Sequence, residues 1–202
     1  MARAPFAMGI ELKAKIKKIS EIWVGYQPKG RIEHDADNTH RLIQIKDFQD
    51  DGSIDFDSLS WIIPDRDPER YQVQEGDVLF SARGRYNTAY VLEGVPAHTL
   101  AGGNFFVVRS ERKGVLPGYL AWALNQPVTQ EEIKSRTMGT NISYISKKAF
   151  GDLEVPVPPL DVQRKICDLI GLQQQEQGLL MQLATKREQL VQAVCYQAAK
   201  RG

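Results

Sequence analysis

The sequence predicts an α+β protein in which a mixed α/β globular domain is followed by one long helix. Up to about residue 155, short β-branched or aromatic runs alternate with turns that contain Gly or Asp and with short helical segments. From residue 161 to 199 the chain holds no Pro, and apolar residues recur every three or four positions. We therefore expect a domain over residues 1–155, a proline-rich junction over 156–160 and a long helix over 161–202.

Strands of the globular domain are predicted from four short runs of β-branched, aromatic or other apolar residues. These runs cover residues 42–45, 77–80, 88–92 and 105–108. Turns are expected at 50–53 and 102–104. The second of these, Gly-Gly-Asn, precedes a strand, whereas a dinucleotide-binding glycine motif precedes a helix, so we expect only a turn there.

Three short helices are predicted between the strands. Residues 11–19 form a short, basic, amphipathic segment. Residues 117–125 begin with Pro117, and Pro is favoured in the first turn of a helix. Residues 128–136 are expected to form a helix capped by Thr129, with Glu131 and Glu132 near its positive end.

The C-terminal region changes character at three prolines, at positions 156, 158 and 159, which require an extended segment. Asp161 is the expected N-cap of the helix that follows. With Ile166 as heptad position a, position a holds residues 166, 173, 180, 187 and 194, and position d holds 169, 176, 183, 190 and 197. The helix is expected to pair through an apolar seam of Ile166, Leu169, Ile170, Leu180, Leu183, Leu190 and Val194.

A helix of about 38 residues is roughly 57 Å long, too long for a domain of this size to cover, so its apolar stripe predicts a partner helix. Folding back onto its own domain is the alternative. In the middle of the seam, Gln173 and Glu176 interrupt the apolar pattern. The two cysteines, Cys167 and Cys195, are roughly 42 Å apart along this helix and cannot bridge within one chain.

Composition excludes several classes of protein. The 202 residues are 42% hydrophobic, too high a share for intrinsic disorder, and no apolar run approaches a membrane span. Two cysteines do not make a disulfide framework, and the first residues lack the apolar stretch of a secretory signal. We therefore expect a cytoplasmic protein without membrane contact.

The formal net charge of +1 hides an uneven distribution along the chain. Residues 1–32 carry +5, residues 33–77 carry −9, residues 78–150 carry +5 and residues 151–202 are neutral. Ordinary solvated surface is one explanation. The other is that the two basic blocks share one face and bind a polyanion, in which case the acidic block should face away from it or towards a partner.

Three segments in the basic blocks combine cations with short hydrogen-bonding residues, as DNA-contacting loops do. Arg pairs with guanine or phosphate, Asn pairs with adenine, and Gly permits close backbone approach. The candidate contacts are Tyr26, Lys29 and Arg31; Ser81, Arg83, Arg85, Tyr86 and Asn87; and Arg136, Thr137, Gly139, Thr140, Asn141, Ser143, Tyr144 and Lys147. A plain basic hairpin loop is the alternative for the second segment.

Other functions have weaker support in the sequence. Walker, CxxC, Gly-x-Ser-x-Gly and HExxH motifs are absent, so no catalytic residue is assigned. His34 and His40 lie among acidic residues, but nothing completes a transition-metal ligand set, so no metal site is expected. A small Mg²⁺-dependent nuclease built on Asp65, Glu132 and Lys134 is one rival function. A protein-interaction module that uses only its helix, without DNA, is the other.

Several motifs, in order, resemble the DNA specificity subunit of type I restriction–modification systems. Residues 19–31 (ISEIWVGYQPKGR) are similar to the opening strand and Gly-x-x-Pro turn of its target recognition domains. Residues 42–47 (LIQIKD) resemble its first central strand, and residues 75–84 (EGDVLFSARG) resemble its Gly-Asp-hydrophobic-Leu strand and loop. Residues 117–120 (PGYL) resemble a helix start, and residues 153–166 (LEVPVPPLDVQRKI) resemble the Pro-Pro-Leu-x-Glu-Gln entry to its conserved helix.

The resemblance implies a non-catalytic module with one recognition domain and one spacer helix, half of a full specificity subunit. Such helices pair antiparallel, so two chains would form a symmetric dimer on a bipartite, palindromic DNA site. The partners implied are double-stranded DNA, methyltransferase subunits that carry S-adenosylmethionine, and restriction subunits; no cofactor is expected in this chain. Two features depart from the family pattern: Val162 stands where the family has Glu, and only one copy of each part is present, as in a natural half subunit or a shortened form.

Overall fold

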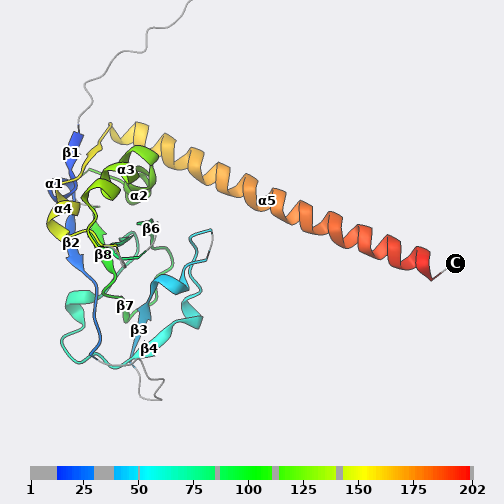
Figure 1. The fold of residues 1–202 in the computed structure, drawn as a ribbon, viewed down its shortest axis with the longest axis horizontal. Helices are drawn as coiled ribbons and strands as arrows, with labels where there is room; N and C mark the ends of the chain where they lie inside the picture. The colour runs from blue at the N-terminus through cyan, green and yellow to red at the C-terminus, as the bar shows by residue number, and fades with distance from the viewer. Residues whose placement is uncertain are drawn as a thin grey trace, which may run out of the picture. The chain divides into compact units, whose positions relative to one another are not determined.

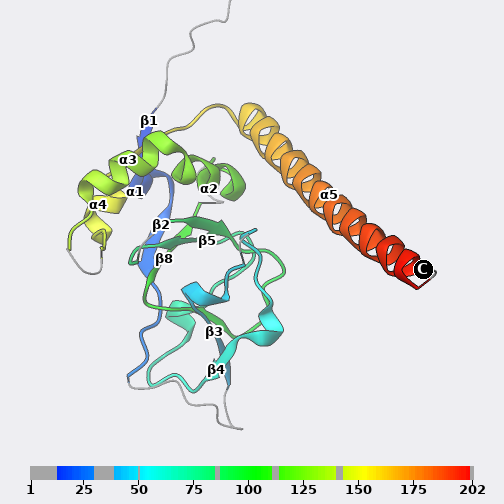
Figure 2. The same ribbon diagram turned by 45° about the vertical axis from the view of Figure 1, so that its right-hand side comes forward.

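The computed structural model describes residues 13–29, 39–49, 51–84, 87–110, 114–139 and 143–200 of the 202. The chain divides into two compact units, Met1–Gln163 and Arg164–Gly202. Figures 1 and 2 show their secondary structure. Within the described segments, no helix combines the length and apolar character needed to cross a membrane.

A four-stranded antiparallel sheet forms the centre of the first unit. Its strand order is β2 (Glu21–Val24), β8 (Phe105–Arg109), β5 (Val78–Ser81) and β6 (Ala89–Val91). On one face, Leu79 lies opposite Val107 in a cluster with residues of the second sheet. On the other face, Phe80 lies opposite Phe106, and both pack against Phe150. Burial on both faces explains why β5 and β8 are nearly continuous apolar runs.

A second sheet has the order β4 (Ser60–Ile62), β3 (His40–Ile43) and β7 (Thr99–Ala101), with β3 antiparallel to β4 and parallel to β7. Three short 3₁₀ helices, η1 (Ile45–Asp47), η2 (Phe56–Ser58) and η3 (Glu69–Tyr71), accompany it. Gly25 links the sheets: the Tyr26 N–H donates to the Ala101 carbonyl at 2.7 Å. A Cβ on Gly25 would collide with the carbonyl oxygens of Ala101 and Gly102, so this close approach requires glycine.

The short helices gather at the opposite end of this unit from the second sheet (Figures 1 and 2). They are α1 (Ile16–Ile19), α2 (Pro117–Asn125), α3 (Pro127–Arg136) and α4 (Lys147–Gly151). A two-stranded ribbon at the same end pairs β1 (Lys13–Lys15) with β9 (Glu154–Pro156) in antiparallel register. The expected extended conformation near the first proline of the junction is thus present as a strand.

The long helix, α5 (Leu160–Ala199), is the expected C-terminal element, and the α+β fold is confirmed. Its first turn includes Gln163, which belongs to the first unit and is completely buried. The Gln163 Oε1 accepts from the Leu116 N–H at 2.9 Å, and its Nε2 donates to the carbonyls of Pro158 at 2.8 Å and Gly114 at 3.2 Å. The Gln163 side chain therefore supplies hydrogen-bond partners to backbone groups before α2 and in the proline-rich junction.

Several element boundaries differ from the sequence prediction. In the described part of the helix expected over residues 11–19, only Ile16–Ile19 is helical, because residues 13–15 pair with β9 instead. Thr129 does not cap α3: the helix begins at Pro127, its N-cap is Gln126, and Thr129 is buried inside it. Asp161 lies inside the first turn of α5, which begins one residue earlier than expected. The turn at Gly102 is present, closed by the Phe105 N–H on the Gly102 carbonyl at 3.0 Å.

Candidate nucleic-acid interface

The structure brings together two of the three candidate segments, although about sixty residues separate them in the sequence. Directly after β5, the Ala82 carbonyl accepts from the Ile145 N–H at 3.0 Å, and the Gly84 N–H donates to the Ser143 carbonyl at 3.1 Å. Arg83 and Tyr144 form an antiparallel bridge between these bonds. The loop after β5 and the segment after α3 therefore present their side chains from one small, backbone-paired surface.

The segment after α3 is itself closed by a reciprocal pair of hydrogen bonds. The Met138 N–H donates to the Tyr144 carbonyl, and the Tyr144 N–H donates to the Met138 carbonyl, each at 2.8 Å. Gly139 adopts a φ of 97°, a left-handed conformation that favours glycine. The side chains of Met138 and Tyr144 are 48% and 40% exposed, so the paired backbone leaves them facing solvent. Thr140 and Asn141 lie outside the described residues.

In the loop after β5, the side chains of two candidate contacts hydrogen-bond to the loop backbone. The Asn87 Nδ2 donates to the Ser81 carbonyl at 2.8 Å, and the Asn87 carbonyl accepts from Gln130 at 2.7 Å. Ser81 is buried, and its hydroxyl donates to the Arg83 carbonyl at 3.2 Å. Arg83 is exposed, so its guanidinium is the described cation of this loop available to a ligand. Arg85 and Tyr86 lie outside the described residues.

Among the remaining candidates around α3 and α4, some side chains are hydrogen-bonded within the chain and one is exposed to solvent. Arg136 is half-buried, forms an ion pair with Glu132 and donates to the Ala149 carbonyl at 3.3 Å. The Thr137 hydroxyl donates to the Ile133 carbonyl at 2.8 Å. Lys147, at the first position of α4, is exposed. Arg136 and Thr137 therefore stabilise the end of α3, while Lys147 faces solvent.

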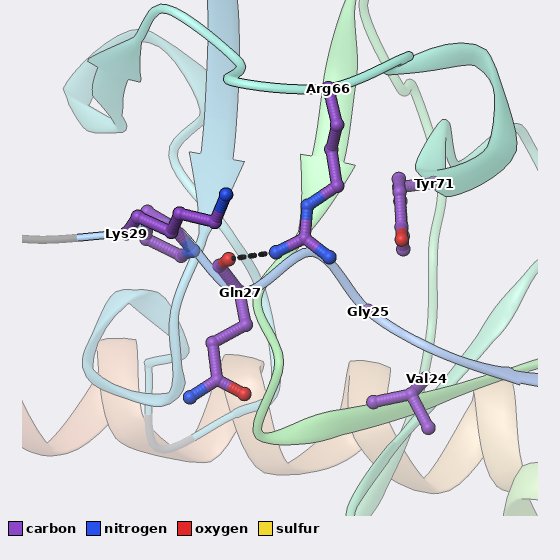
Figure 3. A pocket seen from close by; sticks show the side chains of 7 residues that line it. Val24, Gly25, Gln27, Lys29, Arg66 and Tyr71 are labelled. Atoms are coloured by element: carbon purple, nitrogen blue, oxygen red, sulfur yellow. Dashed lines mark hydrogen bonds between the residues drawn. The ribbon is translucent and has the colours of Figure 1, made fainter.

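The third candidate segment follows β2 and forms one side of a pocket of about 380 Å³ (Figure 3). Tyr26 is buried beneath it; its hydroxyl donates to the Asp65 carboxylate and accepts from the Asp65 N–H at 2.8 Å. The Lys29 ammonium lies 3.4 Å from the same carboxylate, on a side chain that is 82% exposed. Arg31 lies outside the described residues.

Arg66 completes the wall of this pocket. Its Nη2 donates to the Gln27 carbonyl at 2.7 Å, and Figure 3 shows its guanidinium between Gln27 and Tyr71. The guanidinium carbon lies 5.7 Å from the centre of the Tyr71 ring. Two cations and an aromatic ring therefore line the pocket, a combination suited to an anionic ligand. Both cations also lie 3.4 Å from the Asp65 carboxylate, which neutralises part of their charge.

The electrostatics of this cluster keep Asp65 ionised. The hydrogen bond from Tyr26 lowers the pKa of the Asp65 carboxyl below its ordinary value, and the nearby Lys29 adds to the effect. Burial raises the pKa of the Tyr26 hydroxyl, as does its bond to Asp65. At neutral pH the carboxylate is therefore charged and the tyrosine protonated.

The acidic block is not segregated from the basic blocks at two of its residues. Asp65 contacts Lys29, and Asp77 is completely buried in a two-bonded ion pair with Arg109, at 2.7 and 2.8 Å. These two carboxylates therefore lie against cations of the basic blocks. Each of them neutralises a cation from another block. The expectation that the acidic block faces away from a bound polyanion, or towards a partner, stays a prediction.

Sequence reasoning did not assign the roles of Arg66, Tyr71, Asp77 or Gln163. Gln163 and Asp77 do stand inside the quoted motifs, in residues 153–166 and 75–84. For both residues the sequence offered one signal, a polar residue next to apolar ones, which is typical of a buried polar group with hydrogen-bond partners. Arg66 and Tyr71 had no such signal, because only the folded chain places them beside the turn after β2.

A metal-dependent active site has no support in the described part of the chain. Asp65 is engaged with Tyr26 and Lys29, and Glu132 with Arg136. No three His, Cys, Asp or Glu side chains among the described residues gather as a metal site would require.

The fold is that of known specificity subunits of type I restriction–modification systems. The S subunit from M. genitalium is similar over 84% of this chain and 40% of that one, with a TM-score of 0.56 at 13% identity. The HsdS subunit from Thermoanaerobacter tengcongensis is similar over 85% and 40%, with a TM-score of 0.57 at 21% identity. A structure describing complex assembly and conformational transition of the type I R-M system gives a TM-score of 0.62 at 20% identity, over 86% and 42%.

Residues 15–177 match the family model of the type I restriction modification DNA specificity domain. The chain belongs to this family, which confirms the resemblance drawn from its motifs. The type I restriction enzyme MjaX specificity subunit assigned in Methanocaldococcus jannaschii is 27% identical over 127 residues, 60% of this chain. The MjaVIII specificity subunit of the same organism is 29% identical over 65 residues, 32% of this chain. The chain spans about 30% and 15% of the length of these two relatives.

Proposed function

We propose that this chain is a non-catalytic DNA recognition module that directs methyltransferase and restriction subunits to a specific site. The observation that carries the proposal is the backbone pairing of the loop after β5 with the segment after α3. That pairing joins two basic segments distant in sequence and leaves Arg83, Tyr144 and Lys147 accessible on them. Paired loops on a rigid sheet are the usual location for residues that read a ligand.

The exposed side chains suggest two kinds of contact with duplex DNA, one to base edges and one to phosphates. Arg83 has the planar donors that pair with guanine in the major groove or clamp a phosphate. Lys147 and Lys29 would neutralise phosphates and set the position of the domain on the duplex without reading sequence. Ser81, Asn87, Arg136 and Thr137 would hold the loop backbones in place, as their hydrogen bonds within the chain indicate.

The helix α5 would provide the second half of the function. Residues 169–194 display leucines and valines that are about half to two-thirds exposed in the single chain, so a partner helix would gain apolar burial. Pairing of two copies through this face would place two recognition domains on DNA, and two-fold symmetry then predicts a bipartite, palindromic site. The methyltransferase partner, not this chain, would supply S-adenosylmethionine and the chemistry.

Fluorescence anisotropy with labelled duplexes across a salt series tests this proposal. Affinity should fall steeply with salt, because phosphate contacts release counterions. Arg83→Ala should weaken binding to the preferred duplex by about 1–3 kcal/mol if the side chain contacts a base. Arg164→Ala, which removes an exposed arginine of α5, is the matched control and should leave affinity unchanged.

Three results would contradict the proposal in whole or in part. Salt-insensitive or absent binding would favour a helix-only interaction protein. Cleavage of plasmid DNA by the purified chain with Mg²⁺ would favour the nuclease instead. Equal affinity of Arg83→Ala and the control would remove the loop after β5 from the interface.

A further inference from the structure

The apolar stripe of α5 contains two charged residues of opposite sign. Glu176 occupies heptad position d and Arg187 occupies position a. They are eleven residues apart, close to three whole turns, so they lie on the same face of the helix but roughly 16 Å from each other. They are thus too far apart to form an ion pair within one helix. Leu169, Leu180, Leu183, Leu190 and Val194 lie on the same face and are 48–66% exposed.

From this pattern we infer that a second copy pairs with α5 in one antiparallel register, selected by reciprocal Glu176–Arg187 contacts between the two chains. The inference rests on the proposed antiparallel self-association and adds its register and the residues that select it. In this register the layers are symmetric about the middle of the helix pair. Leu169 faces Val194 of the other copy, Gln173 faces Leu190, Glu176 faces Arg187, and Leu180 faces Leu183.

The apolar layers support the same alignment as the charges. Each leucine or valine of the seam between residues 169 and 194 meets another apolar residue, except at Gln173–Leu190. The central layers, which pair Leu180 with Leu183 twice, lie between the two charged layers. One antiparallel register therefore places apolar residues opposite apolar residues and opposite charges opposite each other.

Other arrangements of two copies place the charges badly. In a parallel, in-register pair, Glu176 would face Glu176 and Arg187 would face Arg187 of the other copy, which repel. An antiparallel shift of one heptad in one direction sets Glu176 against Leu180 and Arg187 against Leu169. A shift in the other direction sets Glu176 against Val194 and Arg187 against Leu183. Each shifted register desolvates both charges without a partner.

The occupant is a second copy of this chain because the charge pattern is complementary to itself. Reading the seam in reverse exchanges the acidic and the basic layer, so both ion pairs form at once. Paired charges at seam positions also exclude helices with a different charge order, as polar seam residues do in other coiled coils. The charged layers would thus limit pairing with unrelated helices.

Charge reversal of the full chain tests the register directly. In Glu176→Arg, every charged layer would hold two arginines, and in Arg187→Glu two glutamates, so each variant alone should dimerise about 100-fold more weakly or worse. A mixture of the two variants, or the double reversal within one chain, restores opposite charges in every layer. Sedimentation velocity on each sample measures the dimer fraction, with far-ultraviolet circular dichroism confirming that each chain is folded.

Glu188→Arg is the control, because position 188 is one residue along from Arg187 and about 100° further around the helix, at heptad position b. This variant should dimerise like the parent chain. Recovery of dimers in the mixture but in neither single variant supports the register. Single variants that dimerise normally, or a mixture that stays monomeric, would overturn it.

These outcomes are separable from failure of the proposed DNA function, because none of the readouts requires DNA. A parent chain that is monomeric at tens of micromolar would overturn the inference. DNA recognition by each domain would still stand in that case. Dimers with the predicted charge dependence but no DNA affinity would contradict only the proposed function.

Discussion

Gln163→Leu is the change whose effect on the domain follows most directly from the structure. The side chain is completely buried and makes three hydrogen bonds to backbone groups of Leu116, Pro158 and Gly114. Leucine keeps most of the volume and removes all three bonds. A net value of roughly 1 kcal/mol for each bond, with an added penalty for the Leu116 N–H left without its acceptor, gives a loss of about 2–4 kcal/mol.

Urea unfolding followed by tryptophan fluorescence measures this loss, because Trp23, Trp61 and Trp122 all lie in the first unit. For a domain of this size the loss corresponds to a midpoint roughly 1–2 M lower. Gln182→Leu changes the same residue type at an exposed position of α5 and should leave the midpoint unchanged at the same protein concentration. A midpoint for Gln163→Leu within about 0.3 M of the parent would refute the assignment of this glutamine as a structural anchor.

Three further predictions concern other parts of the chain. Asp77→Ala should destabilise the domain by about 2–4 kcal/mol in urea unfolding, because it leaves the Arg109 guanidinium half-buried without its carboxylate; Asp77→Asn should cost less, and equal values would contradict this. Burial and the neighbouring His98 lower the pKa of His40 below its ordinary 6.5, so the unfolded state binds this proton more tightly and stability should fall as pH drops below about 6.5. In His40→Gln that part of the pH dependence should disappear, and an unchanged difference between pH 7.5 and about 5.5 would argue against it. Leu183→Glu should convert the proposed dimer to monomer in light scattering while the domain keeps its unfolding midpoint, and intact dimers would show that the seam lies elsewhere.

The sequence was most informative where local pattern and tertiary burial agree. Residues 78–80 and 105–108 are apolar at successive positions because both faces of their strands are covered, so their pattern was strong. The helix over 117–125 has the predicted bounds, since Pro117 fixes its start. The long helix was identified by local pattern alone, because its three-and-four spacing continues without proline although its apolar residues are exposed in the single chain.

Other features depend on contacts between distant segments and have no local signal. The strand over 13–15 forms only because it pairs with residues 154–156 near the other end of the domain. The strands over 60–62 and 99–101 are three residues long, too short for a clear alternating pattern.

In the candidate interface too, the sequence identified individual residues but not the contacts between distant segments. Composition identified Arg83 and Tyr144 separately, but not the bridge that joins them. It also took Ser81 and Asn87 as surface donors, whereas their hydrogen bonds lie within the loop. Donor-rich loops require some of their polar groups to satisfy their own backbone, and sequence alone does not show which.

Selection of bound sequences from a random duplex pool by the purified full chain tests the central claim most directly. Two recognition domains related by two-fold symmetry should enrich an inverted repeat, with half-sites separated by a constant unread gap. Arg83→Ala should relax the preference at one position in both half-sites. No enriched sequence at moderate salt would contradict DNA recognition by this chain, and enrichment of a single, unrepeated half-site would contradict the dimer.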